Sequence, residues 1–205
     1  MKSTLRAEFV NLPNLLTYIR VAAIPLVMLL IWRGEPESCV IAAWVYSFAT
    51  ITDFFDGWLA RRLGLVTVLG KFLDPLADKL MVMAMLVMMV SLNRVPGWLV
   101  VIILAREMTI NGLRAIASSE GLVIPAGWFG KYKTALQLIA IMCLLVHYPY
   151  TLWFFGVYEE RVDFNVVGIW VLGFSVIFSV ISAVQYFRDF FRALDSRRRQ
   201  DHEDP

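Results

Sequence analysis

Asp53-Phe-Phe-Asp-Gly-Trp-Leu-Ala-Arg61 and, after eight further residues, Gly70-Lys-Phe-Leu-Asp-Pro-Leu-Ala-Asp78 carry four aspartates at helical spacing. The first two aspartates are three positions apart and the last two are four apart. On helices, these spacings put each pair on one face. Because the connecting segment is short, we expect the two acidic faces to meet.

Long apolar runs lie on both sides of this motif. Hydrophobic residues make up 59% of the 205-residue chain and charged residues only 18%, whereas a soluble domain carries about 25% charged residues. Runs of about 20 apolar residues match a hydrocarbon core of about 30 Å, and helices satisfy their own backbone groups in lipid. The sequence therefore predicts an all-α integral membrane bundle with six transmembrane helices, at about residues 15–32, 40–59, 72–92, 96–117, 135–155 and 166–187.

We expect a single domain over residues 1–205, because neither a repeat nor a linker interrupts the chain. The acidic segment 158–163 is expected to form a solvated loop, and residues 188–205 a basic cytoplasmic tail. The N-terminus lacks the pattern of a cleaved signal peptide, so the first apolar run should remain in the mature protein.

Lysine and arginine are distributed unevenly between the two expected sides of the membrane. The outer connections hold Arg33, Arg94 and Arg161. The positive-inside rule therefore places both termini in the cytoplasm. The basic residues on the cytoplasmic side are Lys2, Arg6, Arg61, Arg62, Lys71, Lys131, Lys133, Arg188, Arg192, Arg197, Arg198 and Arg199.

Four carboxylates beside hydrocarbon are energetically unfavourable, since inserting each one at the centre of a membrane helix costs about 2.5 to 3.5 kcal/mol. Structural ion pairs with neighbouring basic residues are one interpretation. Recurrence at helical spacing on two adjacent helices favours a metal site instead. Carboxylates suit Mg²⁺ or Mn²⁺ better than zinc, and two such cations neutralise four carboxylates. The expected ligands are Asp53, Asp56, Asp74 and Asp78.

The motif resembles the signature of the CDP-alcohol phosphatidyltransferases, with every fixed position matched. It reads Asp53-x-x-Asp56-Gly57-x-x-Ala60-Arg61-x8-Gly70-x3-Asp74-x3-Asp78. The opening segment Asn11–Arg20 also fits the family. This resemblance implies a six-helix fold, a homodimer, and two divalent cations held by the four aspartates.

The resemblance also implies roles for the other motif residues. Arg61 would donate to a phosphate of the CDP-lipid, and three small residues, Gly57, Ala60 and Gly70, would let the nucleotide approach. Asp78 would be the catalytic base that takes the proton from the acceptor hydroxyl. That hydroxyl would attack the phosphorus bearing diacylglycerol, and CMP would leave.

A second group of residues bears on the acceptor. Arg106 lies within an apolar run and needs a partner, and neighbouring helical residues such as Glu107 do not normally face one another. Arg114 is eight residues further on and therefore near the same face. With Lys131 and Lys133, these arginines predict a basic pocket for a phosphate group. An ordinary cytoplasmic basic cluster is the alternative.

The segments Ala105–Arg114 and Gly130–Thr134 resemble those of the bacterial phosphatidylglycerophosphate synthases within the family. This likeness implies CDP-diacylglycerol and sn-glycerol 3-phosphate as substrates, and a bacterial inner-membrane protein with a cytoplasmic active site among membrane lipids. No nucleic-acid partner is expected. Inositol phosphate, serine or phosphatidylglycerol are alternative acceptors. A cation-coupled transporter and a catalytically inactive scaffold are alternatives outside this reaction class.

Overall fold

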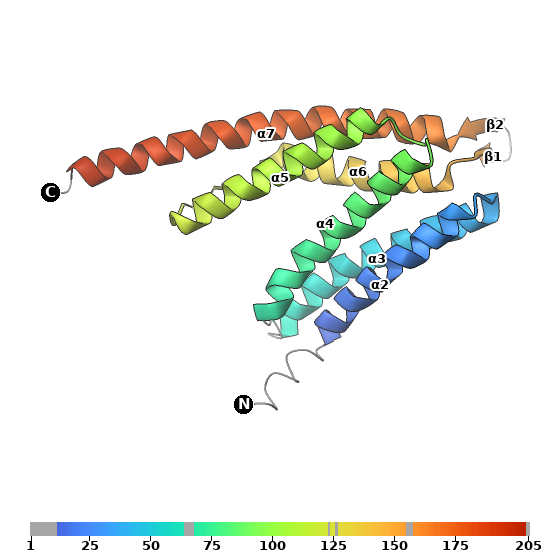
Figure 1. The fold of residues 1–205 in the computed structure, drawn as a ribbon, viewed down its shortest axis with the longest axis horizontal. Coiled ribbons are helices and arrows are strands. Elements are labelled where there is room, and N and C mark those ends of the chain that lie inside the picture. The colour runs from blue at the N-terminus through green and yellow to red at the C-terminus, as the bar shows by residue number, and fades with distance from the viewer. Residues whose placement is uncertain (1–11, 64–67, 123, 126, 155–157, 204–205) are drawn as a thin grey trace. The chain divides into compact units, whose positions relative to one another are not determined.

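The structure is a computed structural model that describes residues 12–63, 68–122, 124–125, 127–154 and 158–203. Within these ranges only the backbone is described at 12–14, 53–63, 68–75, 153–154, 158–160 and 198–203. The described residues form six helices and one hairpin (Figure 1). The helices are α2 (Leu12–Trp32), α3 (Pro36–Leu63), α4 (Val68–Ser91), α5 (Gly97–Ser119), α6 (Trp128–Val146) and α7 (Phe164–Glu203). The strands are β1 (Pro149–Phe154) and β2 (Tyr158–Asp163).

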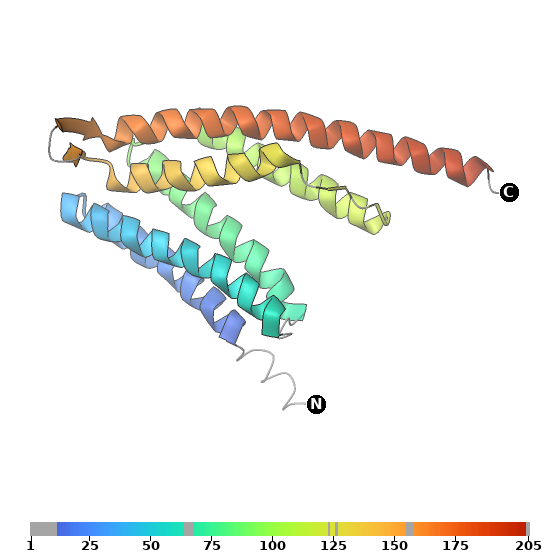
Figure 2. The same ribbon diagram turned by 180° about the vertical axis from the view of Figure 1, so that it is seen from behind.

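The chain forms two compact units. The first comprises Met1–Val95 with Ile141–Gly168, and the second Pro96–Ala140 with Ile169–Pro205. In the first unit, α2 packs against both α3 and α4, as both ribbon views show (Figures 1 and 2). The organisation as one domain stays a prediction.

The helical class is confirmed, because each of the six apolar runs overlaps a helix. Three segments of the described residues are long and apolar enough to cross a membrane by length and composition. They are Leu15–Trp32, Trp128–Val146 and Phe164–Arg197. The chain is therefore a helical membrane protein.

The predicted fifth span is wrong in its bounds. Helix α6 begins at Trp128 and ends at Val146, whereas the apolar run suggested 135–155. His147 has a φ of +62°, a left-handed conformation that commonly ends a helix. Tyr148 precedes Pro149, and a residue before proline is disfavoured in helical conformation. The apolar residues that follow form strand β1 instead.

The sequence suggested a solvated loop for the acidic segment 158–163, and this expectation is wrong. The segment forms β2, which pairs antiparallel with β1 from Pro149↔Asp163 to Phe154↔Tyr158. Asp163 then begins the last helix, because its Oδ1 accepts hydrogen bonds from the backbone N–H groups of Asn165 (2.9 Å) and Val166 (3.2 Å). Such a cap satisfies donors that a helix start leaves unpaired.

The predicted basic tail, residues 188–205, is mostly part of the last helix. Helix α7 runs for 40 residues to Glu203, past the predicted span of 166–187 (Figure 2). At 1.5 Å per residue it is about 60 Å long, twice a hydrocarbon core of about 30 Å. The helix is thus longer than a crossing requires, and it includes most of the basic segment.

Buried Arg94 ties three segments of the first unit together. Its Nη1 donates to the backbone carbonyls of Leu144 and Leu145, each at 3.2 Å, at the end of α6. Its Nη2 lies 3.2 Å from Cys39 Sγ on α3. A cation satisfies the carbonyl groups that a helix end leaves unpaired. This residue, which the sequence indicated only as an outer-side charge, therefore has a packing role.

A close approach at Gly168 gives a test of this packing. A methyl group there would lie 2.7 Å from Leu144 Cγ and 3.1 Å from Leu144 N, whereas one at Gly173, also on α7, would meet nothing within 4 Å. Overpacking costs about 1 to 3 kcal/mol, and Gly→Ala in an open helical position gains about 0.5 to 1 kcal/mol. We expect Gly168→Ala to lower, and Gly173→Ala to raise, the thermal unfolding midpoint in detergent. Equal midpoints for the two variants would contradict this packing.

Candidate functional site

The two aspartate pairs lie on continuous helices. Asp53 and Asp56 are within α3, and Asp74 and Asp78 are within α4. The helical backbone on which the spacing argument depends is therefore present. The side chains of the first three aspartates are outside the described part of the structure, as are those of Gly57, Ala60, Arg61 and Gly70. Their roles as metal ligands and as contacts to the CDP-lipid stay predictions.

Asp78 is the one member of the motif whose side chain is described, and it is half-buried. Its charge acts on the Tyr46 hydroxyl of α3, a side chain that is only 2% exposed. Asp78 is therefore within electrostatic range of the helix that carries Asp53 and Asp56. The expectation that the two acidic faces meet stays a prediction.

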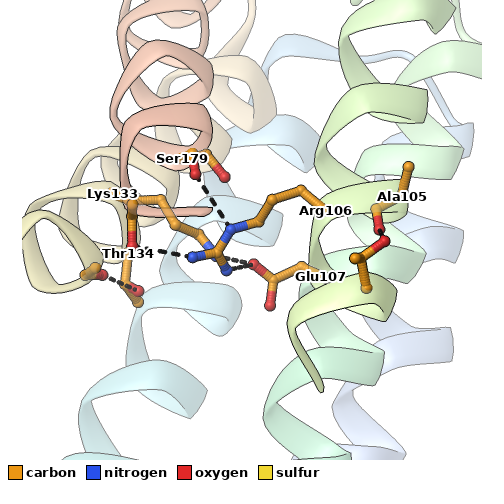
Figure 3. A network of polar contacts seen from close by, with 9 residues as sticks. Ala105, Arg106, Glu107, Lys133, Thr134 and Ser179 are labelled. Carbon is orange, nitrogen blue, oxygen red and sulfur yellow. Dashed lines mark hydrogen bonds and ion pairs between the residues drawn. The ribbon is translucent and has the colours of Figure 1, made fainter. Parts of the chain in front are cut away.

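Arg106 joins α5 to α7 in the second unit. Its Nε donates to the backbone carbonyl of Ser179 at 3.3 Å, and its Nη2 donates to Ser182 Oγ at 3.2 Å. Its Nη1 donates to Glu107 Oε1 at 2.9 Å (Figure 3). The expectation that Glu107 would not pair with its neighbour is thus wrong. Neighbouring helical residues leave the backbone in different directions, but the arginine side chain is long enough to reach the Glu107 carboxylate.

Lys133 of α6 reaches the same carboxylate. Its Nζ forms an ion pair with Glu107 Oε1, the oxygen that also accepts from Arg106 (Figure 3). The side chains of Arg106, Glu107 and Lys133 are only 12%, 15% and 8% exposed. We call these three residues the Glu107 cluster. With two cations and one carboxylate, it carries a net charge of +1.

The other two predicted acceptor residues have different surroundings. Arg114 lies over the Tyr186 ring, with its Cζ 5.9 Å from the ring centroid, and Lys131 Nζ lies 4.9 Å from the Trp128 ring centroid. Both side chains belong to exposed residues. Arg114 remains within electrostatic range of Arg106. The structure thus brings Arg106 and Lys133 onto one carboxylate, and holds Arg114 and Lys131 on aromatic faces.

Sequence reasoning missed the polar residues of α6 and α7 beside this cluster. Ser175, Ser179 and Ser182 follow helical spacing within an apolar run, and all three are buried. Gln137 of α6 is 5% exposed. Within the described residues, Gln137 Nε2, Ser175 Oγ and Ser179 Oγ have no hydrogen-bond partner. Serines at a spacing of four and then three residues were the available signal of a buried polar face.

The fold defines the class of the molecule, which is a helical membrane protein. Comparison with known proteins then gives its family. The chain belongs to the CDP-alcohol phosphatidyltransferase family, whose model matches residues 10–181. It is therefore a transferase of phospholipid biosynthesis.

Several bacterial relatives cover most of the chain. A Bacillus subtilis protein named CDP-diacylglycerol–glycerol-3-phosphate 3-phosphatidyltransferase is 38% identical, over 90% of this chain and 97% of its own length. A Pseudomonas fluorescens protein of the same name is 40% identical, over 70% of this chain and 76% of its own. A Mycobacterium tuberculosis protein named probable phosphatidylglycerophosphate synthase is 33% identical, over 95% and 88%.

Proposed function

We propose that this chain transfers the phosphatidyl group of CDP-diacylglycerol to sn-glycerol 3-phosphate, giving phosphatidylglycerophosphate and CMP. The observation that carries the proposal is the similarity to a relative named for this reaction over 90% of the chain. The Glu107 cluster supports the choice of acceptor, because two cations that converge on one anion suit a substrate that carries its own phosphate.

The donor set fits two divalent cations, Mg²⁺ or Mn²⁺. Asp53 and Asp56 on α3, with Asp74 and Asp78 on α4, supply only carboxylate oxygens, the ligand type these ions prefer. When bound, the cations would neutralise charge that develops on the pyrophosphate during transfer. Four carboxylates near hydrocarbon would in turn be compensated by the metal charge.

The chain's own residues then bind and orient the two substrates. Arg61 donates to a phosphate of the CDP-lipid as a planar fork. The small residues Gly57, Ala60 and Gly70 leave room for the nucleotide beside the helices. Arg106 and Lys133 hold the acceptor phosphate, with Arg114 and Lys131 contributing positive charge to its approach.

Asp78 takes the proton from the acceptor hydroxyl, while the hydroxyl oxygen forms a bond to the phosphorus bearing diacylglycerol. The bond from that phosphorus to the CMP oxygen breaks, and CMP leaves with the electron pair. A carboxylate bound to a cation is a weaker base, so the ligand role of Asp78 has more support than its role as base.

We propose six membrane spans in a bacterial inner membrane, with both termini and the active site on the cytoplasmic side, and a homodimer as the assembly. The distribution of Lys and Arg supports this orientation. The bacterial relatives support the location.

CMP release tests the proposal directly. Purified full-length protein in detergent, with Mg²⁺ and CDP-diacylglycerol, is expected to release CMP only when glycerol 3-phosphate is added. Serine, inositol phosphate and phosphatidylglycerol serve as comparison acceptors. Release with one of these instead would preserve the reaction class and overturn the acceptor. Failure with every acceptor, from folded protein, would contradict the enzymatic proposal.

A further inference from the structure

One carboxylate oxygen contacts both half-buried Arg106 and buried Lys133 in the second unit. Glu107 Oε1 accepts from Arg106 Nη1 at 2.9 Å and pairs with Lys133 Nζ. The two cations come from different helices, α5 and α6, so this oxygen stands at the point where their donors converge. Such a point between two donors is where an oxygen of a bound phosphate is stabilised most.

We propose that Glu107 is an internal competitor for the acceptor phosphate. In the substrate-free protein its carboxylate holds the position between Arg106 and Lys133, and the incoming phosphate displaces it from that position. Glu107 is therefore a positioning residue that acts through the two cations. The inference rests on the proposed function, and it adds a residue that sets how tightly the phosphate is held.

The charges of the cluster favour such an exchange. Arg106 and Lys133 are 12% and 8% exposed, so without an anion they would be two poorly solvated like charges close together. Glu107 leaves the cluster at +1, and a phosphate dianion can neutralise both cations. Each anion is thus stable there alone, but the two together would crowd three negative charges around two positive ones.

Arg106 can remain in place during the exchange. Of the five N–H groups of an arginine side chain, one donates to Ser179 O and one to Ser182 Oγ, both on α7. These bonds hold the guanidinium from the side away from its own helix. Only the bond to Glu107 needs to be released when a phosphate oxygen arrives.

The reaction itself gives a use for a competitor. The phosphate of glycerol 3-phosphate does not react, and it is still present on the product. A pocket with two uncompensated cations would therefore bind the product as tightly as the substrate, and turnover would be limited by release. Return of the Glu107 carboxylate to the two cations offsets the loss of phosphate contacts when the product leaves.

A purely structural role for Glu107 predicts the opposite sign of effect. If the carboxylate only held Arg106 and Lys133 in place for the phosphate, its removal would let them separate and would weaken phosphate binding. If it competes, its neutralisation strengthens binding. Glu107→Gln distinguishes the two, because it removes the charge and keeps a side-chain oxygen of similar reach.

The experiment measures inhibition by inorganic phosphate and steady-state kinetics for full-length Glu107→Gln in detergent with Mg²⁺. We expect the inhibition constant for phosphate and the KM for glycerol 3-phosphate to fall about tenfold, as for the loss of about 1.4 kcal/mol of competition. The kcat should not rise, and the KM for CDP-diacylglycerol should stay unchanged. Glu120→Gln is the matched control, because Glu120 is 54% exposed and pairs with Arg197, 3.7 Å away.

A rise in both acceptor constants in Glu107→Gln would overturn the competitor role while leaving the proposed function intact. If inorganic phosphate does not inhibit the unaltered protein, the competitor role is overturned as well. If CMP release requires an acceptor without phosphate, the acceptor in the proposed function is overturned instead. Glu107→Asp provides a second variant should the first not fold. The shorter aspartate side chain interacts less strongly with the two cations. Competition therefore predicts a lower phosphate inhibition constant and a lower KM for glycerol 3-phosphate in this variant too, whereas a structural role predicts higher values.

Discussion

Asp74→Asn is expected to abolish metal-dependent CMP release while the protein still inserts in the membrane. The substitution removes one of four carboxylates proposed to hold the cations and keeps the size of the side chain. We expect activity to fall by about 10³-fold or more, because positioned charge is the main source of catalysis in such transfers. CMP release at saturating Mg²⁺ and the elution volume of the detergent-solubilised protein are the two measurements.

The matched control for this variant is Asp195→Asn. Asp195 is also a helical aspartate, but it is exposed on α7 and far in sequence from the motif. It should retain the activity of the unaltered protein. Near-normal turnover by Asp74→Asn would contradict the metal-site proposal. Equal loss in both variants would trace the effect to something other than the carboxylate of α4.

Arg106→Ala is expected to raise the KM for glycerol 3-phosphate about 100-fold, with much less effect on the KM for CDP-diacylglycerol. A charge-assisted hydrogen bond contributes about 1.5 to 3 kcal/mol, and a phosphate at Arg106 loses at least one. The Glu107 cluster then keeps one cation and one carboxylate, so less positive charge is left for the acceptor. Initial rates measured with each substrate varied in turn give the two constants.

Two further variants separate binding from packing at Arg106. Arg106 also ties α5 to α7 through Ser179 and Ser182, so thermal unfolding should be measured alongside the kinetics. Arg106→Lys keeps the charge without the planar fork, and we expect it to recover only part of the acceptor affinity. Arg197→Ala, at a surface ion pair, is the control. If the two KM values of Arg106→Ala rose together, the acceptor pocket would be misplaced.

Local pattern was sufficient for the helices and insufficient for some of their ends. Runs of apolar residues predicted the six helices of the described residues, because hydropathy and length are properties of a contiguous segment. The end of α6 was misplaced because residues 149–154 are apolar enough to continue a span. A positive φ at His147 and the pairing of β1 with β2 outweighed that signal. Strand pairing depends on a partner segment, which no single run of residues reveals.

The candidate site divides in the same way. The aspartate motif could be recognised in the sequence, because the spacing of its residues is itself the signal. The role of these aspartates as metal ligands remains a prediction. For the acceptor, the sequence predicted one pocket from four basic residues, whereas the structure joins only Arg106 and Lys133 on one carboxylate. Lys131 and Lys133 differ by two positions, and in the structure one lies on Trp128 while the other reaches Glu107.

By itself, the sequence determined that this is a helical membrane protein, and its spaced aspartates indicated the family that the comparisons then established. These properties depend on composition and on residues close together in the chain. Only the tertiary structure decided that Glu107 lies between Arg106 and Lys133, and that Ser179 and Ser182 hold the arginine from α7. The physical reason is that side-chain reach and helix packing, rather than sequence spacing, determine which buried charges neutralise one another.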